Sequence, residues 1–168
     1  MIRNAVLADL PAIQSIYALA RAFMRKSGNL KQWSNGYPDD QLLMDDISKK
    51  QLFVLEEEGA PHAVFAFILG EDPTYQVIEN GAWPNHKPYG TIHRIGSDQT
   101  RRGVLSKALD FALKFTDEVR ADTHEDNKPM QHTLAKNGFI RCGIIYLENG
   151  DPRIAYQYSK EQGSHENL

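Results

Sequence analysis

The spacing of apolar residues in the first third of the chain predicts a strand followed by two helices. Ile2–Leu7 is a short apolar run, typical of a strand. Apolar residues then recur every three or four positions over Leu10–Met24, the period of an amphipathic helix. Asp9 offers an N-cap for this helix and Gly28 a stop. A second, shorter helix is predicted over about Asp39–Lys49.

The middle of the chain predicts a hairpin, a long loop and another strand. Gln51–Glu56 and His62–Leu69 are rich in β-forming residues and flank the turn sequence Glu57–Pro61. Glu71–Lys87 is polar and contains glycine and proline, which indicates a loop. Pro88–Ile95 is predicted to be the next strand.

The last third continues this mixture of helices and strands. Helical periodicity begins at Arg102 and extends to Phe115. The later elements are a short strand, a helix ending at a glycine, and a closing hairpin, predicted over Val119–Asp122, Asn127–Asn137 with Gly138, Phe139–Leu147 and Arg153–Tyr158. No repeat or linker interrupts the order, so we expect one mixed α/β domain over residues 1–160 and a polar tail over residues 161–168.

Composition narrows the class of protein. The chain has 168 residues, 41% of them hydrophobic, and a net charge of −3, so nothing in it favours nucleic acid or anionic membranes. The longest apolar stretch, Ala63–Leu69, is too short to span a bilayer. The N-terminal residues lack the apolar region of a signal peptide, so we expect a cytoplasmic protein. The one cysteine, Cys142, excludes an internal disulfide, and its apolar neighbours indicate a core thiol rather than a nucleophile.

The segment from Tyr89 to Phe115 carries the clearest chemical signal. A strand that ends in a polar loop and leads directly into a helix directs backbone N–H groups at one point, which suits a phosphate. Arg101 and Arg102 add two cations there, and Gly103 permits a close approach of the backbone. An ordinary turn with a solvated arginine pair is the alternative.

The order of elements over Ile2–Tyr158 resembles the GNAT family of N-acetyltransferases. The resemblance implies a mostly antiparallel central sheet flanked by helices, with acetyl-CoA as the co-substrate. When this loop is matched to the pyrophosphate loop of the family, Thr100 takes the first position and Leu105 lies where glycine or alanine is usual. The cofactor-binding residues implied for this loop and its helix are Gln99, Thr100, Arg101, Arg102, Gly103, Val104, Leu105 and Ser106.

The resemblance also assigns residues outside the loop. The end of the preceding strand, at Arg94 and Ile95, would pair its backbone with the pantetheine arm. Asn127 would donate a hydrogen bond to the same arm, although Asn is also a good helix N-cap. The position where family members often carry a tyrosine that protonates the leaving thiolate is Leu134.

Acetyl transfer to an amine requires a base and a proton for sulfur. His93, on the strand leading to the loop, suits a base near neutral pH, and its alternative role is that of a partly buried strand residue. Tyr146 and Tyr156 are candidates for the proton donor.

Two groups of residues are candidates for the acceptor site. Trp33 and Tyr37 lie in a loop that walls this site in the family, and Phe67, Tyr75 and Trp83 lie in or beside such loops. Their alternative role is to anchor these loops to the body of the protein. Asp122 and His124 would bind a cationic substrate or relay protons, or would only satisfy the backbone at a strand end.

Three functions follow from these residues. The first is transfer of an acetyl group from acetyl-CoA to an amine of a small molecule or peptide. The second is a non-catalytic acyl-CoA-binding module of the same fold, which Leu134 and the scarcity of glycine in the loop favour. The third is a metal hydrolase using Asp122, His124, Asp126 and His132, whose spacing is poor for one metal site, so no metal is expected. The sequence leaves the oligomeric state open, although GNAT proteins often form a homodimer.

Overall fold

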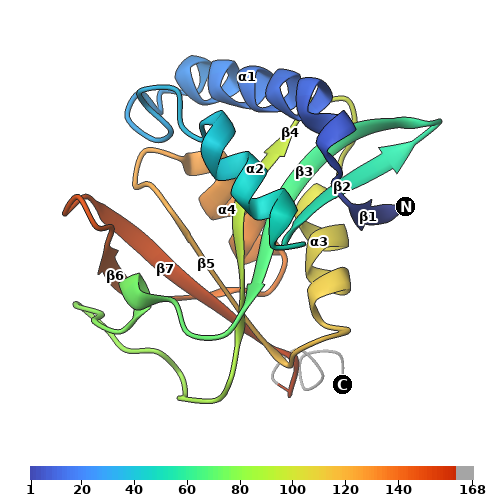
Figure 1. Cartoon of the computed structure of the whole chain (residues 1–168). Helices are drawn as coiled ribbons and strands as arrows, with labels where there is room; N and C mark the ends of the chain where they lie inside the picture. The colour runs from blue at the N-terminus through green and yellow to red at the C-terminus, as the bar shows by residue number, and fades with distance from the viewer. Residues whose placement is uncertain (162–168) are drawn as a thin grey trace.

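Seven strands form one sheet in the computed structural model, which describes residues 1–161 (Figure 1). Their spatial order is β1-β2-β3-β4-β5-β7-β6, and every neighbouring pair is antiparallel except β4 and β5. The strands are β1 (Ile2–Asn4), β2 (Leu52–Glu57), β3 (Ala60–Leu69), β4 (Gly90–Ser97), β5 (Glu118–Thr123), β6 (Ile140–Tyr146) and β7 (Pro152–Ser159). The prediction of a mixed, mostly antiparallel sheet is confirmed.

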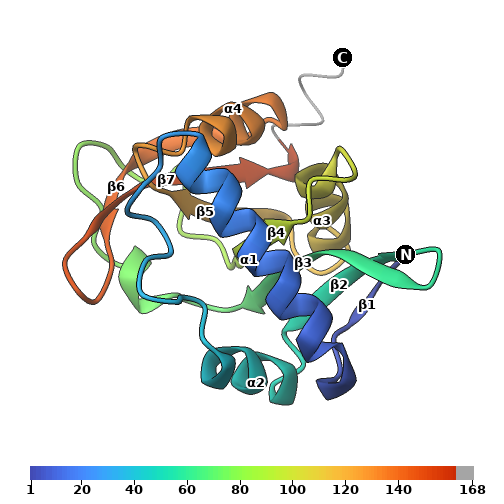
Figure 2. The ribbon, with the colours of Figure 1, turned by 90° about the horizontal axis from the view of Figure 1, so that it is seen from above.

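Helices cover both faces of the sheet, as the view from above shows (Figure 2). Helices α1 (Leu10–Lys26) and α2 (Asp40–Ser48) lie on one face; α3 (Val104–Ala112) and α4 (Lys128–Lys136) lie on the other. Short 3-10 turns occur at η1 (Leu7–Asp9) and η2 (Pro73–Tyr75). No helix within residues 1–161 combines the length and apolar character needed to cross a membrane.

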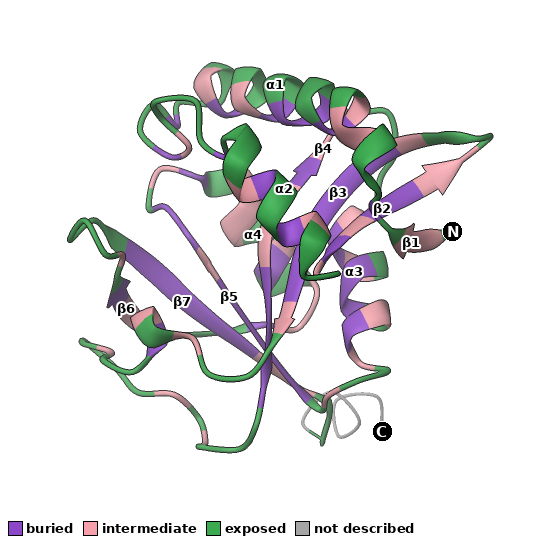
Figure 3. Ribbon diagram, viewed as in Figure 1, coloured by how far each residue is buried: buried purple, intermediate pink, exposed green. Residues whose placement is uncertain are grey.

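Strand β3 joins the two halves of the core because its side chains alternate between the faces. Phe65 and Phe67 pack in the cluster that includes α3, whereas Val64 and Ala66 pack in the cluster that includes α1. Both halves are apolar, so β3 is buried along most of its length, as is β7 (Figure 3). A strand buried on both faces has little freedom to shift register.

Strands β4 and β5 separate after a short paired stretch. Their parallel pairing is confined to Gly90 with Val119 and Thr91 with Arg120. Beyond Thr91, β4 bends away at a bulge, where the register with β3 shifts and Arg94 has a left-handed φ of 50°. The edge of β4 that faces β5 therefore has no strand partner from residue 92 onward among the described residues. The candidate functional site lies in this opening between β4 and β5.

The predicted elements are present, with differences at their ends. The Asp9 side chain does not cap α1: it accepts from the Val6 N–H and pairs with Arg3, because η1 begins before it. Helix α3 ends at Ala112 rather than at Phe115, because the chain turns there to enter β5, and Phe115 is exposed. The predicted loop at Glu71–Lys87 contains η2. Of the predicted tail, residues 162–168 lie outside the described residues.

Candidate functional site

The opening between β4 and β5 is a cleft of about 730 Å³, here called the central cleft. Strands β4 and β5 form its floor, and the connection from α1 to α2, η2 and the β6–β7 hairpin form its walls. Among the sequence-predicted residues, those that line it are Trp33, Tyr37, His93, Arg94, Ile95, Leu105, Asp122, Asn127 and Leu134. The splayed strands thus gather residues from the whole length of the chain.

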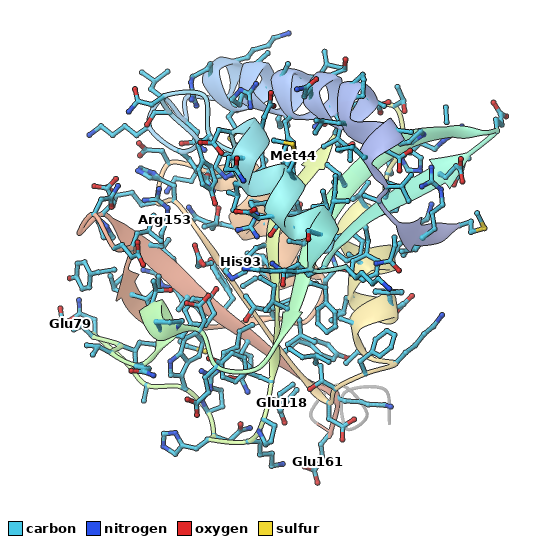
Figure 4. All side chains as sticks on the ribbon, viewed as in Figure 1. Met44, Glu79, His93, Glu118, Arg153 and Glu161 are labelled. Atoms are coloured by element: carbon cyan, nitrogen blue, oxygen red, sulfur yellow. The ribbon has the colours of Figure 1, made fainter. Side chains whose placement is uncertain are left out.

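His93 and Asp72 form a hydrogen-bonded pair in this cleft. His93 lies on β4 at the centre of the molecule (Figure 4), and its Nε2 is 2.9 Å from Asp72 Oδ2. Asp72 also accepts from the Thr74 N–H and hydroxyl, at 2.8 and 2.7 Å. Burial raises the pKa of Asp72, but the bonds from His93 and Thr74 outweigh burial and lower it to about 2.

The ionised Asp72 determines which nitrogen of His93 can act as a base. A carboxylate only accepts hydrogen bonds, so Nε2 of His93 carries the proton that it shares with Asp72. In the neutral imidazole, the lone pair is then on Nδ1. The pair is therefore an oriented base in a cleft. His93 was predicted from the sequence, whereas Asp72 was not, although the sequence Asp72-Pro73-Thr74 is typical of a capped turn.

A second pair, Tyr75 and Asp122, lies beside the first. The Tyr75 hydroxyl donates to Asp122 Oδ2 at 2.6 Å, and the rings of Tyr75 and His93 are 6.1 Å apart. Burial and then the charge of Asp122 raise the pKa of Tyr75 well above its ordinary value. Tyr75 is therefore a neutral donor that orients the Asp122 carboxylate in the cleft.

The loop between β4 and α3 presents backbone groups at its far end. Gly103 is the N-cap of α3 with a left-handed φ of 76°, and no side chain caps the helix. The first N–H groups of α3 thus have no side-chain acceptor. A Cβ at Gly103 would meet nothing within 4 Å, so the space beside this turn is open. The Asp98 carboxylate holds the turn by accepting from the Thr100 N–H and hydroxyl.

The two arginines of this loop differ. Arg101 pairs with Glu57 of β2 at 2.8 Å, and Lys107 of α3 pairs with the same carboxylate at 3.3 Å. Arg102 is exposed and makes no hydrogen bond or ion pair within residues 1–161. Gln99, with a φ of 70°, contributes to the turn through its backbone N–H, which donates to Ser97. Arg102 is therefore the cation of this loop that remains available to an anion.

Arg94, at the bulge of β4, has a structural role. Its guanidinium forms a buried ion pair with Asp46 of α2 at 2.9 Å, and its carbonyl accepts from the Tyr17 hydroxyl at 2.6 Å. Both contacts tie the bulge to α1 and α2. The Arg94 side chain is therefore neutralised, while the adjacent Ile95 lines the cleft.

Asn127 combines the two roles that the sequence allows. Its side-chain oxygen accepts from the Met130 N–H, so it caps α4. Its amide donates to Gln32 at 2.9 Å, which joins α4 to the connection after α1. It also lines the cleft, next to Leu134, which is fully buried. Leu134 offers no proton donor at this position.

Several candidate residues lie away from the pair formed by His93 and Asp72. Tyr146 is outside the cleft lining, and its hydroxyl donates to Glu79 at 3.0 Å. His124 is buried beside the cleft, where its Nδ1 accepts from the Asp126 N–H, as the structural alternative predicted. Tyr156 is buried in the core below α3 and α4.

The large aromatic residues divide between the two predicted roles. Trp33 and Tyr37 line the cleft, with Trp33 packed edge-on against Tyr17. Phe67 instead packs against Phe111 on the opposite face of the sheet. Trp83 stacks on the Arg120 guanidinium, 3.9 Å from its ring centre, and so anchors its loop.

Two other expectations concern metal and thiol chemistry. Within residues 1–161, no group of three or more His, Cys, Asp or Glu side chains is arranged to hold a metal ion. Burial raises the pKa of the Cys142 thiol to about 11, so little thiolate forms near neutral pH.

Comparison with known proteins gives matches in structure. No family model and no curated protein matches the sequence. The fold is similar to that of an acetyltransferase of the GNAT family from Streptococcus agalactiae, with 35% identity over 95% of both chains and a TM-score of 0.84. A putative acetyltransferase from Staphylococcus aureus has 23% identity, a TM-score of 0.71, and coverage of 95% of this chain and 99% of its own. A GNAT-like decarboxylase in complex with isobutyryl-CoA has 15% identity, a TM-score of 0.64, and the same coverage.

Proposed function

The chain belongs to the GNAT family of acetyltransferases, and from this premise we propose that it transfers an acetyl group from acetyl-CoA to an amine. The observation that carries the proposal is the hydrogen-bonded pair of His93 and Asp72 in the central cleft. It supplies a base beside the open edge of β4. The fold of the family provides the cleft, and this pair provides the base that acetyl transfer to an amine requires.

The residues next to one end of the cleft, where Ile95 and Leu105 line it, fit a CoA ester. We call this the cofactor end: the open edge of β4, the loop Gln99–Gly103 and the first turn of α3. The uncapped N–H groups of α3 and the exposed Arg102 suit phosphate oxygens. The unpaired edge of β4 suits the amides of a pantetheine arm, which would add to it as a strand does.

The other end of the cleft supplies the acid–base chemistry. We call this the acceptor end: Asp72, His93, Asp122 and Arg153. Acetyl-CoA supplies an activated thioester. His93 Nδ1 takes a proton from the attacking amine, and the Asp72 carboxylate stabilises the imidazolium that results. Because Leu134 carries no proton, the proton for the leaving sulfur comes from this imidazolium or from water.

A non-catalytic acyl-CoA-binding protein is the second candidate. Leu134 in place of a proton donor favours it. The two candidates share the cofactor end and differ in whether His93 performs chemistry.

Two measurements test the proposal. Calorimetry with acetyl-CoA measures binding at the cofactor end, and release of free thiol with a panel of amines measures transfer. We expect binding and turnover with at least one class of amine. Binding without turnover across the panel would favour the second candidate. Absence of binding at millimolar acetyl-CoA would overturn both.

A further inference from the structure

Arg153 is a buried cation in the wall of the central cleft. It lies at the start of β7, next to the β6–β7 hairpin, and only 7% of its surface is exposed (Figure 4). Arg153 lines the cleft, as do Asp122 of β5 and His93 of β4. The adjacent Ile154 packs in the core on the other side of the sheet, because neighbouring side chains of a strand point to opposite faces.

This guanidinium has no carboxylate partner. It donates one hydrogen bond, from Nη1 to the carbonyl of the adjacent Pro152 at 2.8 Å. No acidic side chain within residues 1–161 forms an ion pair with it. Glu148 and Asp151 line the same cleft from the hairpin, but both are exposed and make no ion pair with it. A buried charge without a partner is costly, so a protein that keeps one there gains from an anion that pairs with it.

Besides Arg94, which Asp46 neutralises, the cleft lining contains two cations, Lys31 and Arg153. Burial lowers the pKa of the neighbouring His124, and the charges of Arg153 and Lys31 lower it further against the opposing effect of Asp126 and Glu125. Lys31 also lines the cleft. The carboxylates of Asp72 and Asp122 lie instead with His93 and Tyr75. The acceptor end thus has a cationic part and an anionic part.

We propose that Arg153 binds a carboxylate of the acceptor, and that the acceptor is a small amino acid whose amine is presented to His93. The inference rests on the proposed function and names its substrate class. A guanidinium binds a carboxylate through two parallel hydrogen bonds, and Nε and Nη2 of Arg153 make none with the described residues. The anionic part of the site attracts the ammonium group before it loses its proton.

The test compares amino acids with matched amines that lack the carboxylate. Each amino acid is assayed beside its C-terminal amide and its decarboxylated amine, by release of free thiol from acetyl-CoA. We expect kcat/KM for the amino acid to exceed that of either partner by about 10- to 100-fold, the usual range for a charge-assisted pair. Equal rates for all three would overturn the proposal.

Variants of Arg153 test whether the preference for amino acids depends on its guanidinium. Arg153→Gln is expected to raise KM for the amino acid by about 10- to 100-fold and to leave the amide unchanged. Arg153→Lys keeps the charge without the planar fork, so part of the preference remains. The matched control is Arg141→Gln, at an exposed position of the neighbouring β6 outside the cleft lining. It should change KM for neither the amino acid nor the amide. Circular dichroism shows whether each variant is folded.

The remaining outcomes separate the two proposals. A weaker affinity for acetyl-CoA in Arg153→Gln, with the preference for amino acids intact, would mean that Arg153 serves the cofactor end and would overturn the inference. If no amine is acetylated, the proposed function fails, and calorimetry of the protein with CoA still compares amino acid with amide. Tighter binding of the amino acid in wild type, lost in Arg153→Gln, supports the inference; equal binding overturns it.

Discussion

The two ends of the central cleft are built in different ways. The cofactor end comes from one continuous segment, from β4 through the loop to α3, and presents mostly backbone groups. The acceptor end is assembled from the segment before η2, from β4, β5 and β7, and presents side chains. A backbone N–H is available from almost any residue, so the cofactor end tolerates a degenerate loop sequence. A side chain has no such substitute, so the acceptor end should be far more sensitive to single changes.

His93→Ala should have the largest effect, at the acceptor end. Loss of the base lowers kcat by about 100- to 10,000-fold, the usual contribution of a positioned acid–base group. The affinity for acetyl-CoA, measured by calorimetry, should not change. His132→Ala, at an exposed position of α4, is the control and retains activity. A normal kcat in the His93→Ala variant would show that His93 is not the base.

Asp72→Asn should have the second-largest effect on activity. The amide no longer stabilises the imidazolium, and kcat falls by about 10- to 100-fold, the value of one charge-assisted hydrogen bond. Affinity for acetyl-CoA again stays constant. A loss confined to acetyl-CoA binding would place Asp72 at the other end of the cleft.

The same variant predicts a pH dependence of stability. The pKa of Asp72 is about 2 in the folded protein, against an ordinary value of 3.8. Because the folded value is lower, the contacts of the carboxylate stabilise the fold above about pH 4, and this contribution is lost as the pH falls toward 2. The difference in Tm between wild type and Asp72→Asn should be constant above about pH 4 and shrink below it. A difference that grows on acidification would contradict this.

Gly103→Ala tests the cofactor end and should have a smaller effect. Its left-handed φ costs an alanine about 1–2 kcal/mol, so the turn shifts and the Kd for acetyl-CoA rises by about 10-fold. At saturating acetyl-CoA, kcat should change little. Gly28→Ala is matched, since Gly28 also has a left-handed φ and open space around it. It should lower stability similarly without changing Kd, and an equal change in Kd would mean that the effect is not local.

Glu57→Gln should have the smallest effect. It releases Arg101 and Lys107 from a partly exposed carboxylate, which makes the loop more positive. The Kd for acetyl-CoA should fall by no more than about 3-fold, and the change should fade at high salt because exposed charges are screened. Glu58→Gln removes the same charge from the adjacent residue, which does not contact Arg101. An equal effect of both variants would attribute it to net charge alone.

The sequence by itself determined the elements and led to the proposal of the cofactor end. Apolar spacing depends only on neighbours along the chain, so α1, α2, α4 and the hairpins were predicted close to their observed limits. The strand, loop and helix around Gly103 are contiguous, and for that reason a joint role in binding phosphate could be proposed from the sequence. His93 was also found, because it lies on the strand that leads into this loop.

Only the tertiary structure decided the acceptor end. Asp72 lies 21 residues before His93, and Tyr75 lies 47 residues before Asp122, so no local pattern joins either pair. Strand β7 lies between β5 and β6, which brings Arg153 beside the cleft, while Tyr146 on β6 meets Glu79 outside it. Local spacing sets which residues share a face of one element. The order in which the strands pair sets which faces meet, and the chemistry of the acceptor end follows from that order.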